Sequence, residues 1–219
     1  MTGAELLEYV RTDLLRDSAL PYLWSDTLIL KYLTEAQEKF ARETYCLSDN
    51  TTAEITTITT EADTAEYALS DLVLHVYSAR VSDVSYNMRD WTSRVVPSHL
   101  LTTTGQPVAY TMDEGTESIR FYPTPETAYT IYLRVARMPL DGIDEDSDPV
   151  IPVRYHLDLG EYAAYRCLMN NDVDGNNLGA AQRLKESWDQ RVSKAKHEYY
   201  RFRHGANPTA MTNWTGKRR

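Results

Sequence analysis

Residues 178–202, LGAAQRLKESWDQRVSKAKHEYYRF, carry the clearest periodicity in this chain. Apolar side chains recur there every three or four residues, which is the spacing that places them on one face of an α-helix. The members of this stripe are Leu178, Ala181, Leu184, Trp188, Val192, Ala195, Tyr199 and Phe202. They cover about seven turns and predict a helix about 36 Å long at a rise of 1.5 Å per residue.

A second helix is predicted immediately before this one, beginning after Pro152. Its apolar residues again share one face. They are Leu159, Tyr162, Ala163 and Cys167. The polar loop NNDVDGNN, residues 170–177, separates the two helices, so the C-terminal part of the chain predicts a helical pair.

The N-terminus predicts another helical pair. Thr2 and Glu5 have the spacing of a capping box, and the helix that follows is expected to end near Arg16. The segment DSALPYLWSD, residues 17–26, interrupts the helical pattern with Pro21, and its Ser25 can accept hydrogen bonds from the free amides of a second helix that reaches about Tyr45. The apolar face of that second helix comprises Ile29, Leu33, Ala36 and Phe40.

The middle of the chain, roughly residues 52–138, predicts β-structure because it is rich in β-branched residues and poor in helix formers. In VLHVYSARVSDV, residues 73–84, strict alternation would place Val73, His75, Tyr77, Ala79 and Val81 on one face and Leu74, Val76 and Ser78 on the other. MDEGTES, residues 112–118, predicts a hairpin turn between two strands. ETAYTIYLRVARMP, residues 126–139, is the clearest strand.

These elements together predict an α+β fold in which a four-helix body carries an inserted, mainly antiparallel β-domain. DGIDEDSDP, residues 141–149, holds five acidic residues and predicts a solvated linker between the two. The expected divisions are an N-terminal helical pair (1–50), a β-rich domain (51–140), an acidic linker (141–152), a C-terminal helical pair (153–204) and an extended arm (205–219).

The composition is that of a globular protein, with 42% hydrophobic and 25% charged residues. Sixteen tyrosines against three phenylalanines favour wide protein interfaces, although a half-exposed β-sheet would use tyrosine too. No stretch approaches 18 apolar residues, and the N-terminus lacks the features of a signal peptide, so no membrane association is expected. Cys46 and Cys167 are expected to be buried free thiols.

The charge is distributed unevenly along the chain. Ten Lys or Arg and three acidic residues lie between Arg183 and Arg219, a net charge of +7, so residues 1–182 carry −16. The cations of the last helix form either a solvated face near the negative end of the helix dipole or a strip that meets an acidic surface on a neighbouring subunit. The candidate interface residues are Arg191, Lys194, Tyr199, Tyr200, Arg201, Phe202 and Arg203.

Candidate catalytic and metal sites are weak. Asn170, Asp172 and Asp174 have the spacing of a calcium loop, but its twelfth position is Ala181, where a bidentate Glu is needed. Nucleophile motifs and Gly-rich phosphate loops are absent, and carboxylate pairs are expected by chance in so acidic a chain. We therefore expect no enzyme activity, no cofactor and no metal.

Three segments resemble the adaptor, or head-to-tail connector, proteins of tailed bacteriophages. These are LPYLWSDTLILKYLTEAQEKFARE (20–43), YPTPETAYTIYLRVARMPL (122–140) and IPVRYHLDLGEYAAYRCLMNND (151–172). The local cues are Trp24-Ser25-Asp26 before the second helix, the last strand between Pro123 and Leu140, Ile151-Pro152, and Tyr155-His156. The resemblance extends over nearly all of residues 12–204.

This resemblance implies a structural role at the head-tail junction of a virion, after synthesis in the cytoplasm of a bacterial host. Such proteins form a ring, usually of twelve copies, beneath the portal protein, where they extend the DNA channel and provide a platform for a tail or nozzle protein. Double-stranded DNA would pass through the lumen without sequence-specific binding. An acidic body suits that passage, because phosphate-binding Lys and Arg would retain the duplex.

The resemblance also implies that the C-terminal segment reaches the portal. In this chain the segment is GANPTAMTNWTGKRR, residues 205–219. We expect Trp214 to be its apolar anchor and Lys217, Arg218 and Arg219 to pair with acidic portal groups. Met211 and Asn213 complete the expected docking residues; the alternative is a solubilising tail without a partner.

Two alternatives belong to other functional classes. One is a cell-wall hydrolase associated with the virion, which would depend on acidic residues in the loops. The other is a DNA-binding protein that uses the basic last helix, which would bind duplex DNA with a steep dependence on salt. A third possibility, closer to the adaptor, is a neighbouring ring component of the tail.

Overall fold

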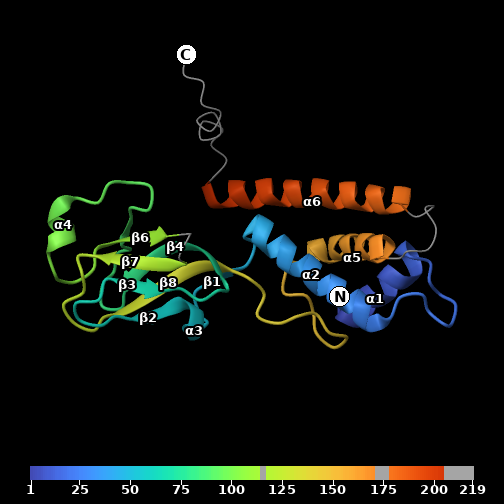
Figure 1. Ribbon diagram of the computed structural model, residues 1–219, viewed down its shortest axis with the longest axis horizontal. Helices are drawn as coiled ribbons and strands as arrows, with labels where there is room; N and C mark the ends of the chain where they lie inside the picture. The colour runs from blue at the N-terminus through green and yellow to red at the C-terminus, as the bar shows by residue number, and fades with distance from the viewer. Residues whose placement is uncertain (114–116, 171–177, 205–219) are drawn as a thin grey trace, which may run out of the picture. The chain divides into compact units, whose positions relative to one another are not determined.

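The computed structural model describes residues 1–113, 117–170 and 178–204, and it confirms an α+β fold. The chain divides into two compact units, which Figure 1 shows in ribbon form. Unit 1 contains the described residues of Met1–Cys46 and of the chain from Asp141 onward, and it is helical. Unit 2, Leu47–Leu140, holds the strands and is inserted between the helical pairs.

Unit 1 begins with α1, Gly3–Tyr9, whose predicted capping box is present. The Thr2 hydroxyl accepts a hydrogen bond from the Glu5 amide at 3.2 Å, and the Glu5 carboxylate accepts one from the Thr2 amide at 3.1 Å. The helix then widens into a π-helix, Val10–Leu14, which the sequence did not predict. It ends close to the expected position, because Arg16 has a φ of 55° that no right-handed helix accommodates.

The second predicted helix is α2, Asp26–Thr44, and its predicted cap is also present, since the Ser25 hydroxyl accepts a hydrogen bond from the Leu28 amide at 3.3 Å. A short 3-10 turn, Val153–Tyr155, leads into α5, His156–Asn170, and the chain continues to α6, Leu178–His204. Helix α5 packs against both α2 and α6. These helices confirm the four-helix body.

The core of unit 1 contains a cluster of aromatic rings contributed by three helices. Trp188 of α6 is 1% exposed, and its ring lies 6.0 Å from that of Phe40 and 5.1 Å from that of Tyr162. Each of these large rings adds apolar area to the core, which is the main source of its stability. Trp188 therefore connects α6 to both α2 and α5.

The two ends of the apolar stripe on α6 differ from the prediction. Leu178 is 60% exposed and Phe202 is 87% exposed, whereas Ala181, Trp188, Val192 and Ala195 are buried as expected. Helix α6 has 27 residues, but α5 has 15 and α2 has 19. The face of α6 that the other described helices bury therefore extends from Ala181 to Ala195 and does not include Leu178 or Phe202.

The acidic segment 141–149 is more ordered than a solvated linker. Its carboxylates are exposed, but Ile143 is buried, and its amide donates to the Thr34 hydroxyl at 2.9 Å. The backbone oxygen of Ser147 accepts from the Gly3 amide at 2.8 Å, so the segment satisfies free amides at the start of α1. A Cβ at Gly3 would lie 1.8 Å from the Asp144 oxygen, which explains the glycine at this contact.

Unit 2 consists of two four-stranded sheets. In the first, β8 (Thr130–Arg137) pairs with β1 (Ser48–Asp49) and β2 (Thr57–Thr59) along one edge and with β4 (Val73–Val81) along the other. The second has the order β3 (Glu66–Ala68), β7 (Ser118–Tyr122), β6 (Ala109–Asp113) and β5 (Arg89–Asp90). Pairing is antiparallel except between β5 and β6. Strands β6 and β7 form the predicted hairpin.

Two short helices in unit 2 were not predicted. They are α3, Ala53–Thr56, and α4, Ser98–Thr102. The first lies in a segment that the composition assigned to β-structure. At four and five residues, both helices are too short for a periodic pattern to reveal.

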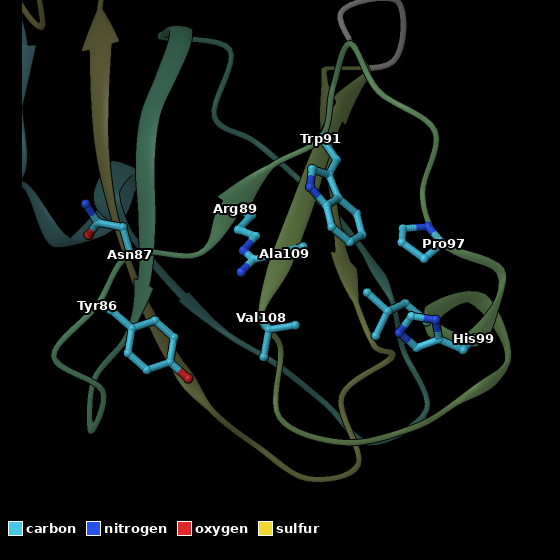
Figure 2. A pocket seen from close by; sticks show the side chains of 9 residues that line it. Tyr86, Asn87, Arg89, Trp91, Pro97, His99, Val108 and Ala109 are labelled. Atoms are coloured by element: carbon cyan, nitrogen blue, oxygen red, sulfur yellow. The ribbon is translucent and has the colours of Figure 1, made fainter.

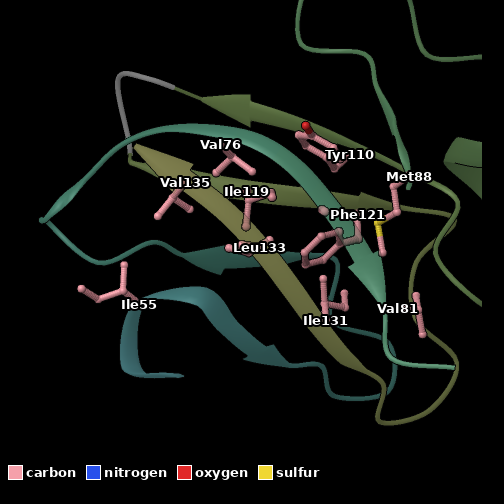
Figure 3. Packing of buried hydrophobic residues seen from close by; sticks show 11 residues of the cluster. Ile55, Val76, Val81, Met88, Tyr110, Ile119, Phe121, Ile131, Leu133 and Val135 are labelled. Atoms are coloured by element: carbon pink, nitrogen blue, oxygen red, sulfur yellow. The ribbon is translucent and has the colours of Figure 1, made fainter. Parts of the chain in front are cut away.

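The predicted alternation along β4 is wrong at Val76. The register against β8 shifts between Val76 and Ser78, so that Val76 lies opposite Val135 while Ala79 lies opposite Leu133. A β-bulge adds one residue to a strand, which reverses the faces of the residues beyond it. Val76 therefore joins Ala79 and Val81 in the apolar core, where Figure 3 shows it near Val135.

Asp49 joins the first and last strands of unit 2. Its buried carboxylate accepts hydrogen bonds from the Thr51 and Thr52 amides, at 2.8 and 3.1 Å, and from the Thr52 hydroxyl at 2.7 Å. Arg137 at the end of β8 adds an ion pair at 2.6 Å. Burial by itself would raise the pKa of Asp49, but these hydrogen bonds outweigh it and hold the pKa far below its ordinary value.

Replacing Asp49 with Asn is expected to lower the free energy of unfolding at pH 7 by about 2 kcal/mol, since it weakens hydrogen bonds to a charged acceptor. A carboxyl whose pKa is lowered by folding stabilises the protein above its unfolded pKa, and this contribution is lost as the pH falls. Chemical denaturation at pH 7 and at pH 3 measures the free energy of unfolding of the wild type and of the Asn variant. The difference between these two free energies should be smaller at pH 3 than at pH 7. A gap that does not narrow would contradict this role of the Asp49 charge.

Candidate interaction surfaces

Several cations of the predicted basic strip on α6 are engaged within unit 1. Arg191 forms ion pairs with Asp158 and Glu161 of α5, the second at 2.9 Å. Arg203 donates to the backbone oxygens of Thr44 and Tyr45 at the end of α2, where a cation is favoured by the helix dipole. These two residues hold α6 to its neighbours, which the sequence pattern did not indicate.

Other cations of α6 are exposed. Arg183, Lys194, Lys196 and Arg201 form no ion pair with any residue in the described ranges. Phe202, in the last turn, exposes most of its ring, and the neighbouring Tyr200 is 42% exposed. The end of α6 therefore presents two aromatic rings beside cations, a combination common at the centre of protein interfaces.

Tyr199 lies in an intramolecular cluster. Its ring is 6.3 Å from that of Tyr155, and the Arg154 guanidinium lies over both rings, at 5.7 Å from Tyr199 and 4.9 Å from Tyr155. Burial raises the pKa of Tyr199 to about 12. The Tyr155 hydroxyl donates to Glu198 at 2.9 Å. Of the predicted interface residues, Tyr199 thus contributes mainly to packing between the start of α5 and the end of α6.

An acidic surface lies on the segment between unit 2 and α5. Its exposed carboxylates are those of Asp141, Asp144, Glu145, Asp146 and Asp148. The Ser147 hydroxyl and amide donate to Asp144, which lowers the pKa of that carboxyl. Hydrogen bonds between Asp144 and Ser147 thus hold the backbone of this segment, and its carboxylates are exposed to solvent from that fixed backbone.

A loop between the π-helix and α2 carries exposed apolar residues; we call residues 16–25 the Leu20 loop. Leu20 is 79% exposed, Leu23 is 57% exposed and Tyr22 is 43% exposed. Isolated apolar residues at a surface are ordinary, but three within four positions form a patch. The sequence pattern did not indicate that this loop would expose an apolar patch.

The Leu20 loop is anchored by the buried guanidinium of Arg11. This group forms ion pairs with Asp17, at 2.9 Å, and with Asp26, and it lies 3.9 Å from the centre of the Tyr22 ring. Asp17 in turn accepts hydrogen bonds from the Leu23 and Trp24 amides, at 3.0 and 3.2 Å. The two ends of the loop are therefore held by one charge network.

Trp24 attaches the same loop to α5. Its side chain is buried, and its indole N–H donates to the backbone oxygen of Cys167 at 3.1 Å. The exposed tip thus lies on a rigid base. The sequence contained one signal for this loop, the cluster Trp24-Ser25-Asp26, but nothing in the spacing of Arg11 and Asp17 indicated their ion pair.

Unit 2 contains a pocket of about 510 Å³, which we call the Trp91 pocket. Figure 2 shows Arg89 and Val108 near its middle, Tyr86 on one side, and Trp91, Pro97 and His99 on the other. The remaining lining residues are Asn87, Leu100 and Ala109. None of the described residues that line the pocket is a carboxylate, so an apolar or negatively charged occupant would fit the chemistry of this lining.

The described residues contain no group of three His, Cys, Asp or Glu placed to hold a metal ion. Most of the calcium-like segment after Asn170, residues 171–177, lies outside them. Cys167 is buried, and burial raises the pKa of its thiol to about 12; Cys46 is partly exposed, which departs from the expectation for that thiol. Within the described chain, no helix is long and apolar enough to cross a membrane.

The predicted docking residues Met211, Asn213, Trp214, Lys217, Arg218 and Arg219 lie outside the described residues.

Comparison with known families gives a match over most of the chain. The family model described as SU10 adaptor protein matches residues 1–212. No curated protein matches the sequence.

Proposed function

Because the chain belongs to the SU10 adaptor protein family, a family of phage head-tail adaptors, we propose that it forms a ring beneath the portal and extends the DNA channel toward the tail. As a phage adaptor it is a virion component that associates with other head-tail proteins. The proposal specifies the partners: further copies of this chain, usually twelve in a ring, the portal protein on one side, and a tail or nozzle protein on the other.

The observation that carries this proposal is the family match over residues 1–212. The charge distribution supports it, because residues 1–182 carry −16 and would repel the DNA phosphates that move through a channel. Unit 1 also displays cations on α6 and acids on segment 141–148, both exposed to solvent within one copy. Surfaces of opposite sign on one subunit suit contacts between neighbouring copies.

Residues 205–219 are proposed to be the portal-docking arm. Trp214 is its apolar anchor, and Lys217, Arg218 and Arg219 pair with portal carboxylates. Arg203 supports this assignment, since it fixes the last turn of α6 to the end of α2 immediately before the arm begins. An arm that leaves a fixed helix end loses less freedom on binding than one that leaves a mobile end.

A chain that ends at His204 is expected to bind the purified portal at least 100-fold more weakly than the full chain, about 2.7 kcal/mol of binding free energy. The matched control replaces Lys217, Arg218 and Arg219 with Gln and keeps Trp214. It should weaken binding less, and its affinity should depend less on salt than that of the full chain. Surface plasmon resonance at two salt concentrations measures both effects; equal affinity of the full and shortened chains would remove the arm from the mechanism.

One observation favours a second candidate, a DNA-binding protein, namely the exposed cations Arg183, Lys194, Lys196 and Arg201 along α6. Tight binding of duplex DNA that weakens steeply between 50 and 200 mM salt would support it. If the chain is an adaptor, we expect it to bind duplex DNA weakly at both salt concentrations. The family is one of structural adaptors, so a cell-wall hydrolase has less support, and no lysis is expected in a gel assay.

A further inference from the structure

The outward face of α6 carries a row of cations. Arg183, Lys194 and Arg201 are 11 and 7 residues apart, close to three and two turns of a helix, so they lie along one line. Val192 follows Arg183 by nine residues, or two and a half turns, which places the line opposite the buried face of α6. The line is about 27 Å long at 1.5 Å per residue. We call these three exposed residues the cationic row.

The charge of α6 remains positive when its paired side chains are set aside. Contacts within one copy already engage Lys185, Asp189, Arg191, Glu198 and Arg203. The cations outside any ion pair with a described residue are the cationic row and Lys196, and the corresponding acid is Glu186. Four such cations and one such acid leave α6 with a net charge of +3 for a partner to neutralise.

Segment 141–148 has the opposite charge. Its five carboxylates are exposed, no Lys or Arg lies among them, and none forms an ion pair with a described residue. Lys31 and Glu38 flank Thr34, the α2 residue that binds the segment, and their charges cancel. Elsewhere in the described chain, the densest run of exposed acids without a cation is Glu61, Asp63 and Glu66. The segment is therefore the densest group of unpaired carboxylates that a second copy offers to the row.

Both surfaces also carry exposed apolar side chains. Phe202, which is 87% exposed, follows Arg201 in the last turn of α6. Val150 and Val153, which are 48% and 71% exposed, follow the acidic segment. Apolar side chains beside charges are typical of protein interfaces. The two surfaces are therefore opposite in charge, and each adds an apolar end.

The two surfaces lie on opposite sides of unit 1. The acidic segment is held by amides at the start of α1 and by Thr34 and Gln37 of α2, whereas the cationic row is on the face of α6 turned away from its neighbours. Figure 1 shows α6 on one side of α2 and α5 and the loop that contains the segment on the other. The row of one copy therefore cannot reach the segment of the same copy.

We propose that the cationic row of one copy binds segment 141–148 of the next copy. This inference rests on the proposed function, because it assigns a contact between copies in the ring. The row and the segment are different surfaces, so the contact is heterologous, and each copy offers the row to one neighbour and the segment to the other. Repeats of such a contact close into a ring when the rotation between copies fits.

Reversing the charges on either side tests the contact. The row variant carries Lys194→Glu and Arg201→Glu, and the acid variant carries Glu145→Lys and Asp146→Lys. All four side chains are exposed. Each full-length variant, and an equal mixture of the two, is titrated onto purified portal, and closed rings are counted by electron microscopy. The matched control, Arg80→Glu with Arg94→Glu, reverses two exposed cations of unit 2 and should assemble like the wild type.

Alone, each variant places like charges at every contact, so we expect it to need about tenfold more subunit than the wild type for the same number of rings. In the mixture, a row variant finds an acid variant on both sides, and the requirement should return to within about threefold of wild type. A mixture no better than its components, or components that assemble like the wild type, overturns this contact and leaves the ring function standing. Absence of any ring of wild-type chain on the portal overturns the proposed function and this contact with it.

Discussion

Replacing Trp188 with Ala is expected to lower the free energy of unfolding by about 4 kcal/mol. Trp188 is buried where α6 meets α2 and α5, and its ring contacts those of Phe40 and Tyr162. Truncation removes the apolar area of the indole. It also leaves a cavity, because the closely packed rings around it cannot move far enough to fill the space. Urea denaturation followed by circular dichroism measures the loss.

Phe202→Ala is the matched control for this substitution. Phe202 belongs to the same apolar stripe on the same helix, but it is 87% exposed. Its truncation should change the free energy of unfolding by less than about 0.5 kcal/mol. Similar losses from the two substitutions would mean that α6 does not pack through the face that contains Trp188.

Arg11→Ala is expected to cost about 3 kcal/mol or more, because it leaves the carboxylate of Asp17 buried without its cation. It also removes the donor to the Trp24 backbone oxygen and the cation above the Tyr22 ring. In the wild-type protein the Leu23 and Trp24 amides donate hydrogen bonds to the Asp17 carboxylate. Hydrogen exchange at these two amides should therefore accelerate in the variant. Denaturation and hydrogen exchange measured on the same variant separate the loss of stability from the loosening of the loop.

Lys31→Ala provides the comparison, since Lys31 is an exposed cation on α2 and alanine is a strong helix former. Its effect should stay within about 0.5 kcal/mol, with unchanged exchange at Leu23. If Arg11→Ala proves as stable as the Lys31 variant, the charge network does not hold the Leu20 loop. The exposed tip of the loop would then not be held rigidly by Arg11.

The helices of unit 1 could be predicted because their signals are local. Capping residues such as Thr2 and Ser25 act on amides three residues away, and apolar periodicity reports one buried face directly. The exposure of Phe202 could not be predicted in the same way. It depends on which turns of α6 the neighbouring helices cover, and the pattern within one helix does not contain that information.

In the strands, too, local features could be predicted and features that depend on a partner strand could not. The alternation in β8 predicted a strand, and the hairpin between β6 and β7 follows from its turn residues. The bulge in β4 is a property of the pairing between two strands, so alternation along β4 alone assigned Val76 to the wrong face. The short helices α3 and α4 are too brief to give a pattern.

The candidate surfaces were the least predictable part of the chain. The charge pattern indicated a basic α6, but only the structure shows that Arg191 and Arg203 are engaged within unit 1 while Lys194 and Arg201 are exposed. The Trp91 pocket combines residues from segments 86–100 and 108–109, which no motif connects. Contacts between segments distant in sequence carry no local signal, and interaction surfaces consist mostly of such contacts.

Electron microscopy of the full-length chain mixed with purified portal tests the central claim most directly. We expect a closed ring of copies, twelve in number, on one face of the portal, with a central opening wide enough for duplex DNA. Portals that carry no ring, together with subunits that remain single even at high protein concentration, would contradict this expectation.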